Sequence, residues 1–318
     1  MKNLDKLLSW LQTSEYDGVI LGRRDNFKWI TEENANAVVT NAEVGVAHLL
    51  IEKDGSVTVA ADSSDCPRME AEQNALGAKG MLIPWYESFE AHLKDYIGDR
   101  TFASDTGIVG TDNVQSDLIN VRMQLSEKER KRYRKIGQEC AGIVEGVAMN
   151  ARPGQTEQEI ADKIRTGCIA NGISMTRMVY FVPVPEEIKG RMQKTQKIFA
   201  AMQNLMKDGM SYQTYFRKIQ ELYAKEGCPE EWKMHHQGGP TGYGCREFVV
   251  TPVIGGRIRN NQAYAWNPTI VGTKCEETTF LTDNGVEIFT RTKVWPCSMI
   301  ETKYGSCSVA DILYIKNE

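Results

Sequence analysis

The stretch SEKERKRYRKIGQECAGIVEGVAMNARPGQTEQEIADKIRTGCIANG, residues Ser126–Gly172, predicts two helices joined by a tight turn. Each helix opens on a capping box, at Ser126–Glu129 and at Thr156–Glu159, where a hydroxyl and a carboxylate bind the first backbone N–H groups. Pro153-Gly154 ends the first helix and Gly172 ends the second. Apolar residues at helical spacing predict the inward faces: Ile136, Cys140, Ile143, Val144 and Val147, then Ile160, Ile164, Cys168 and Ile169.

The same pattern occurs a second time along the chain. An apolar helical stripe over Ile188–Met206 stops at Asp208-Gly209, and a second helix runs from Ser211 to Gly227. A repeated helix–turn–helix unit indicates an internal structural duplication, and the alternative is two unrelated amphipathic helix pairs.

The sequences that follow the two helix pairs differ. After the second pair, strands are expected at Val249–Ile254, Gln262–Trp266, Glu277–Leu281 and Val286–Thr290. After the first pair, one strand is expected, at Met178–Val182. We therefore expect a mostly antiparallel sheet that is incomplete in its first half.

The chain in front of Ser126 alternates between helical and strand-like patterns. Helices are expected at Leu4–Leu11, Asp62–Leu76 and Phe89–Ile97, and strands at Gly18–Leu21, Val46–Ile51, Val57–Ala61 and Gly80–Ile83. This predicts an N-terminal α/β domain over residues 1–122 and an α+β domain over residues 123–318.

The overall composition excludes several classes of protein. The chain has 318 residues and a net charge of −4, which argues against a general nucleic-acid binder. The start, MKNLDKLLSWLQTSEYDG, has no signal-peptide core, and no apolar run is long enough to cross a bilayer. The eight cysteines are dispersed without a C-x-x-C pair, so reduced thiols in a cytoplasmic protein are expected.

The stretch MHHQGGPTGYGCREF, Met234–Phe248, is the strongest candidate for chemistry. It contains two of the four histidines, followed by a glycine-rich turn and an Arg-Glu pair. His235 and His236 are either metal ligands or the polar wall of a binding cleft. Arg246 and Glu247 are candidates for binding a substrate carboxylate, with a salt bridge as the alternative.

The order and spacing of these pieces resemble the creatinase / Xaa-Pro peptidase / methionine aminopeptidase family, whose catalytic domain has the pita-bread fold. The resemblance also includes the stretch NPTIVGTKCEETTFLTDNGVEIFT at Asn267–Thr290, and it covers nearly the whole chain. It is closest to bacterial Xaa-Pro aminopeptidase-like proteins. It implies peptide-bond hydrolysis by two divalent metals about 3.5–4 Å apart that activate a bridging water.

Carried over from the family, the metal ligands are two aspartates, a histidine and two glutamates. The histidine corresponds to His236, or to His235 if the register shifts by one, and one glutamate corresponds to Glu276. The other glutamate is replaced by Asn267, a weaker ligand because its amide oxygen is uncharged. The aspartates have no counterpart, because Ile173–Pro185, where they belong, contains no aspartate. The resemblance therefore implies a degenerate metal centre and doubtful peptidase activity.

Three classes of function remain open. The first is an Xaa-Pro aminopeptidase or dipeptidase that uses Mn, Co or Zn, with His236, Glu276 and Glu247 as the remaining candidate ligands. The second is a metal-independent C–N hydrolase of the creatinase type, in which His236 moves a proton. The third is a non-catalytic homologue that binds a peptide or a partner through the same cleft. The resemblance also implies a homodimer.

Overall fold

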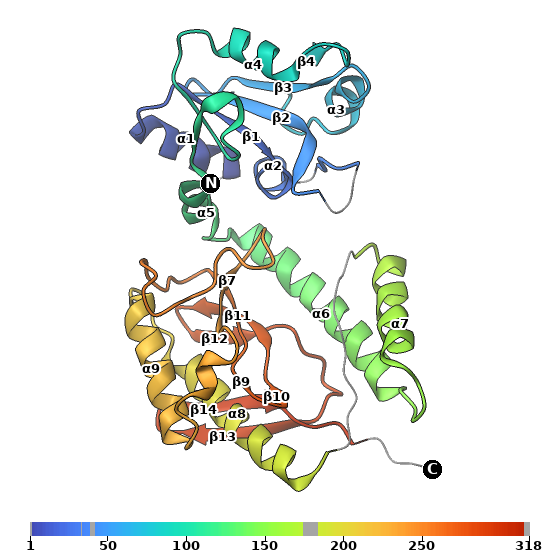
Figure 1. The fold of residues 1–318 in the computed structure, drawn as a ribbon, viewed down its shortest axis with the longest axis vertical. Coiled ribbons are helices and arrows are strands. Elements are labelled where there is room, and N and C mark those ends of the chain that lie inside the picture. The colour runs from blue at the N-terminus through green and yellow to red at the C-terminus, as the bar shows by residue number, and fades with distance from the viewer. Residues whose placement is uncertain (1, 33, 39–41, 174–183, 315–318) are drawn as a thin grey trace. The chain divides into compact units, whose positions relative to one another are not determined.

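The computed structural model divides into two compact units, Met1–Met123 with Tyr243–Cys245, and Gln124–Gly242 with Arg246–Glu318. The structure describes residues 2–32, 34–38, 42–173 and 184–314 (Figure 1). Among these residues, no helix is long and apolar enough to cross a membrane.

The first unit is built on a six-stranded mixed sheet in the order β4-β3-β2-β1-β5-β6. Its strands are β1 (Gly18–Arg23), β2 (Val44–Glu52), β3 (Val57–Asp62), β4 (Lys79–Ile83), β5 (Phe102–Ser104) and β6 (Asp112–Asn113). Its helices are α1 (Asn3–Thr13), α2 (Arg24–Thr31), α3 (Cys66–Glu72), α4 (Phe89–Ile97) and α5 (Gln115–Arg122), with a 3₁₀ turn, η1, at Ile108–Gly110. The α/β architecture expected for the N-terminal part is therefore confirmed, and its sheet is mixed.

Alternation along the central strands gives this sheet two buried faces. Val19 and Leu21 of β1 belong to one hydrophobic cluster, while Ile20 between them belongs to another. Leu49 and Leu50 of β2 divide in the same way. Successive strand side chains point to opposite faces, so apolar residues at consecutive positions require helices on both sides.

The predicted helix Asp62–Leu76 is too long, because α3 covers only Cys66–Glu72. The carboxylate of Asp62 accepts hydrogen bonds from the backbone N–H groups of Ser64 and Asp65, at 2.8 and 3.1 Å, and this turn delays the helix. Pro67 then occupies the first turn of the helix, where its missing N–H costs nothing.

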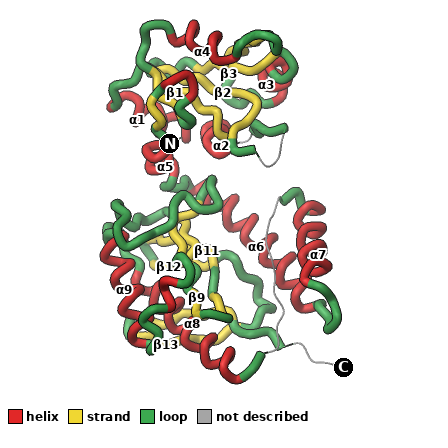
Figure 2. The backbone as a smooth tube through the Cα atoms, in the orientation of Figure 1, coloured by secondary structure: helices red, strands yellow, loops and turns green. Residues whose placement is uncertain are grey.

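The described residues of the second unit form four helices and three antiparallel sheets, with the helices drawn in red and the strands in yellow in Figure 2. The helices are α6 (Glu127–Met149), α7 (Glu157–Ala170), α8 (Glu186–Leu205) and α9 (Tyr212–Lys225), with a 3₁₀ turn, η2, at Glu231–Lys233. The largest sheet has the order β12-β11-β8-β7, from β7 (Gly238–Thr241), β8 (Ala263–Trp266), β11 (Glu277–Thr282) and β12 (Gly285–Ile288). Two hairpins join β9 (Thr269–Ile270) to β10 (Thr273–Lys274) and β13 (Cys297–Thr302) to β14 (Gly305–Ala310).

Both predicted capping boxes form. Ser126 Oγ accepts the backbone N–H of Glu129 at 3.3 Å, and the Glu129 carboxylate accepts the N–H of Ser126 at 2.6 Å. Thr156 and Glu159 exchange the same pair of hydrogen bonds at 3.2 and 2.7 Å. These local interactions fix the start of each helix before any tertiary contact is made.

The predicted inward faces of α6 and α7 need one correction each. Ile136 is 51% exposed and Ile169 is 73% exposed, so neither points inward. Ile143, Val144 and Val147 are partly buried, as predicted, and the fully buried residues of α6 are Glu129, Gly137, Ala141, Glu145 and Ala148. Small residues lie there because α6 approaches the chain after β12 closely, where Gly137 faces Phe289.

The predicted strand Val249–Ile254 does not form. The backbone N–H groups of Glu247 and Val250 bond to carbonyls of β7, at 3.0 and 2.9 Å, and the chain then turns at Pro252, which has no N–H to donate. The neighbouring glycine-rich segment, expected to be a turn, instead contains β7. A Cβ atom at Gly238 would lie 2.1 Å from the Ala265 carbonyl of β8, so this pairing depends on glycine.

The predicted strand Met178–Val182 lies outside the described residues. The prediction that the first half of the sheet is incomplete is therefore not tested.

Candidate functional site

A buried glutamine holds the histidine loop in front of β7. The Gln237 side chain donates to the carbonyls of Trp232 and His235, at 3.1 and 2.6 Å, and accepts from the Tyr223 hydroxyl at 2.8 Å. It is fully buried, so these bonds meet most of its hydrogen-bonding capacity. Gln237 therefore fixes the backbone from which the two histidines project.

The two histidines adopt opposite tautomers. His235 Nδ1 lies 2.6 Å from the carbonyl of His236, and because a carbonyl only accepts, this nitrogen carries the hydrogen. His236 Nδ1 accepts from the backbone N–H of Gly238 at 3.2 Å, so the hydrogen of that ring is on Nε2. In the neutral state His235 therefore offers a lone pair at Nε2, while His236 offers an N–H.

The surroundings keep His236 neutral. Partial burial is the largest influence on the pKa of His236 and lowers it. The nearby His235 ring and the positive charges of Arg246 and Lys274 lower this pKa further, and only Glu276 opposes them. At neutral pH His236 is thus a hydrogen-bond donor without a charge.

Glu276 is held between two cations. Its carboxylate accepts from Arg246 Nη2 at 2.7 Å and lies 2.8 Å from Lys274 Nζ. Burial raises the pKa of Glu276, but the Lys274 ammonium and the Arg246 guanidinium outweigh this effect and hold the pKa below its usual value. Glu276 is therefore ionised, and its negative charge is already compensated by side chains of this chain.

Asn267 lies at the end of β8, where the resemblance places a glutamate. It is 2% exposed, and its backbone N–H bonds to the carbonyl of Gln237 at 3.1 Å. Its side-chain oxygen has no hydrogen-bond partner among the described residues. A charged glutamate at so buried a position would need a cation, whereas the neutral amide does not.

Glu247 and Glu277 have other surroundings. Glu247 is buried, and its carboxylate packs so near Gly242 that a Cβ there would lie 2.7 Å from it. Glu277 accepts from Arg291 Nε at 2.6 Å and from Thr290 Oγ1 at 2.9 Å. The neighbours Glu276 and Glu277 thus bind different partners, as expected for adjacent positions entering a strand.

The described residues of this site do not match a dinuclear metal centre. No group of three or more His, Cys, Asp or Glu side chains within the described ranges is placed to hold a metal ion. Glu276 is neutralised by two cations, Asn267 is uncharged, and His236 presents an N–H in place of a lone pair. Divalent metals in such sites need several charged oxygen ligands, so the donor set does not fit.

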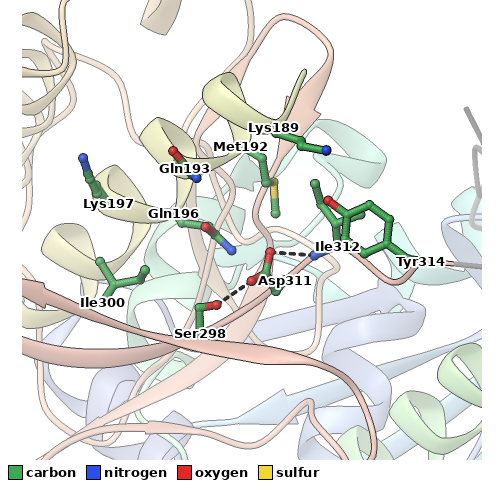
Figure 3. A pocket seen from close by; sticks show the side chains of 10 residues that line it. All are labelled: Lys189, Met192, Gln193, Gln196, Lys197, Ser298, Ile300, Asp311, Ile312 and Tyr314. Carbon is green, nitrogen blue, oxygen red and sulfur yellow. Dashed lines mark hydrogen bonds between the residues drawn. The ribbon is translucent and has the colours of Figure 1, made fainter. Parts of the chain in front are cut away.

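Two cavities of the second unit lie near these elements. One of about 420 Å³ is lined by α8, β13 and the segment after β14, and its charged groups are Lys189, Lys197 and Asp311 (Figure 3). Ser298 and the backbone N–H of Ile312 already bind Asp311. The other cavity, of about 300 Å³, is lined by α6, β11 and the segment after β12, and it includes Glu276. Of the predicted site residues, Glu276 alone lines either cavity.

The fold is similar to that of solved peptidases. A prolidase from Thermococcus sibiricus aligns with a TM-score of 0.75 at 14% identity, covering 92% of this chain and 97% of that one. An X-Pro aminopeptidase from Thermotoga maritima aligns with a TM-score of 0.64 at 14% identity, covering 89% and 97%. The N-terminal domain of the FACT complex subunit SPT16 from chickpea aligns with a TM-score of 0.65 at 8% identity, covering 91% and 96%.

These similarities define the class of fold. No protein-family profile matches the sequence, and no curated protein matches it by sequence. The chain has the pita-bread-like fold of prolidases and Xaa-Pro peptidases, as the sequence resemblance implies.

Two residues that shape the site were not singled out from the sequence. Lys274 has no distinguishing pattern around it, and it becomes notable only because it contacts Glu276. Gln237 follows the histidines directly, and its complete burial is the feature that marks it. A polar residue between two histidines and a glycine gives no periodic signal from which burial could be inferred.

Proposed function

We propose that this protein is a non-hydrolytic homologue of the Xaa-Pro peptidases that binds peptides through His236 and Lys274. The observation that carries the proposal is the double ion pair of Glu276 with Arg246 and Lys274. In a dinuclear enzyme the corresponding carboxylate would compensate metal charge, and here two side-chain cations take that role. The Nε2–H of His236 and the half-exposed Lys274 ammonium are donors suited to peptide carbonyl or carboxylate oxygens.

The fold itself is compatible with a binding role. One of the similar structures is described as part of a complex subunit and the others as peptidases, so the same fold is found under both descriptions. The choice between a peptidase and a binding protein therefore rests on the site residues of this chain.

Metal content and hydrolysis of the dipeptide Gly-Pro test this proposal together. The protein should retain less than one equivalent of Mn, Co or Zn after dialysis against each metal, because Glu276 is the one carried-over carboxylate and it is already paired. Gly-Pro should bind in calorimetry, and no free proline should be released with or without added metal. Metal-dependent release of proline that Glu276→Gln abolishes would show that the protein is a peptidase.

Substitution of His236 tests whether the histidine loop belongs to the binding cleft. His236→Ala should change the free energy of unfolding by no more than about 1 kcal/mol, because the side chain is exposed, and it should abolish Gly-Pro binding. His92→Ala, in the first unit, should do neither. Unchanged Gly-Pro binding by His236→Ala would remove this residue from the cleft.

A metal-independent C–N hydrolase is the second candidate, and the observation in its favour is the tautomer of His235. Its Nε2 lone pair could accept a proton, which His236 Nε2, already protonated, could not. Hydrolysis of creatine that His235→Ala abolishes and His236→Ala retains would favour this candidate.

A further inference from the structure

The cavity of about 300 Å³ beside α6 includes Glu276, and neither His235 nor His236 lines it. One wall is apolar and comes from Ala141 and Val144 of α6, together with Trp295 and Ala310. The other wall holds three acidic side chains and one basic side chain: Glu145, Glu276, Glu277 and Arg291. A volume of this size, with an apolar wall and a few convergent polar groups, is typical of a small-molecule site.

The cations at the polar wall are shared unevenly among its carboxylates. Arg291 neutralises Glu277 through a 2.6 Å contact, and the two cations described above neutralise Glu276. Among the described residues, Glu145 accepts hydrogen bonds from Thr292, whose backbone N–H lies 3.1 Å from one carboxylate oxygen and whose hydroxyl bonds to the other. Within the described part of the chain, no cation lies within ion-pair distance of Glu145.

Glu145 is also well buried, at 7% exposed. A carboxylate with neutral hydrogen-bond donors but no counter-charge is costly to bury. The negative charge of Glu145 also acts on Glu277. Burial raises the pKa of Glu277, the Glu145 charge raises this pKa further, and Arg291 opposes both by lowering it. A bound cation would relieve both.

We propose that this cavity is a binding site for a small organic cation, an alkylammonium whose charged end pairs with Glu145 and whose apolar end packs against Val144 and Trp295. The indole ring adds an aromatic surface, which attracts cations, and the apolar wall favours an alkyl chain over an inorganic ion. Glu276 lines this cavity and also belongs to the histidine site, but recognition is assigned to Glu145, Val144 and Trp295, so this proposal does not depend on the proposed peptide binding.

Calorimetric titration of the full-length protein with n-butylammonium tests the site. Binding is expected for n-butylammonium, and neither n-butanol nor n-butyrate should bind, because they share the chain but lack the positive charge. Binding of n-butanol as tight as that of the ammonium, or no binding of n-butylammonium by folded protein, would overturn the proposal.

Variants identify the residues that recognise the ligand. Glu145→Gln keeps an acceptor for Thr292 and should weaken n-butylammonium binding by at least about tenfold, since a charge-assisted contact is lost. Val144→Phe should abolish binding by filling the cavity. Glu139→Gln removes a carboxylate from α6 that does not line the cavity, and it should bind like the wild type.

Protection of Cys140 gives a measurement that needs no variant. Its thiol lines the cavity, whereas Cys297 is exposed elsewhere on the second unit. Peptide mass spectrometry should show that n-butylammonium slows the alkylation of Cys140 by iodoacetamide and leaves that of Cys297 unchanged. Equal alkylation of Cys140 with and without n-butylammonium at saturating concentration would contradict the site.

Discussion

His48 is buried in β2 of the first unit without a charge partner. It is 7% exposed, its ring centroid lies 5.0 Å from that of Phe89, and its Nδ1 has no hydrogen-bond partner among the described residues. Burial lowers the pKa of His48 from 6.5 to about 4. The folded protein therefore holds this ring neutral under conditions in which the unfolded chain protonates it.

The pKa of His48 links the stability of the first unit to pH. Because the folded pKa is below the unfolded value, the contribution is fully present above pH 6.5 and is lost as the pH falls toward 4. The full loss amounts to about 3 kcal/mol. His48→Phe, which keeps a ring of similar size, should reduce the fall in urea midpoint between pH 7 and pH 5. His92→Gln, at a more exposed histidine, should show the same decrease in urea midpoint as the wild type. An equal decrease in all three proteins would contradict this account of His48.

At the level of elements, α6 depends on one close approach. A Cβ atom added at Gly137 would lie 2.6 Å from the Phe289 ring and 3.0 Å from the Phe289 carbonyl. Two hydrogen bonds also hold α6 in place. Arg134 donates to Glu287 of β12 at 2.5 Å, and Gln138 donates to the carbonyl of Phe289, just after β12, at 2.7 Å. The helix has little freedom to move away and make room for a larger residue.

Substitution of the three glycines of α6 by alanine tests this approach. Gly137→Ala should lower the free energy of unfolding by about 1–3 kcal/mol, because the overpacking exceeds the gain in helix propensity. Gly142→Ala and Gly146→Ala meet no atom within 4 Å and should each raise it by up to about 1 kcal/mol. Chemical denaturation measures all three, and a stabilising Gly137→Ala would show that α6 does not lie this close to Phe289.

For the whole molecule, we propose a homodimer. The first unit exposes three large apolar side chains next to its edge strand β4, with Leu82 at 54%, Trp85 at 74% and Tyr86 at 73% exposed. Unpaired edges flanked by apolar side chains are common sites of association. Sedimentation at micromolar concentration should show a dimer, and Trp85→Ser should shift it toward monomer. Val253→Ser, at an 82% exposed position of the second unit, should leave the dimer unchanged. A monomeric wild type would contradict the proposal.

The features of this protein that local chemistry controls could be predicted from the residues alone. The capping boxes at Ser126 and Thr156 set the start of α6 and α7, and the short apolar run at Gly18–Leu21 identified β1. The order of these pieces led to the Xaa-Pro peptidase-like fold. These features were predictable because each depends on residues within a few positions of one another.

The buried faces and the surroundings of each site residue depend on long-range contacts that local patterns do not show. The small-residue face of α6 is buried because Phe289 lies opposite it, and β7 forms where Gly238 admits the backbone of β8 and Gly239 that of Phe248. Glu276 is an ion-pair partner because Arg246, 30 positions earlier, reaches it. Such pairings join residues that are distant in the chain, so no local periodicity or propensity encodes them.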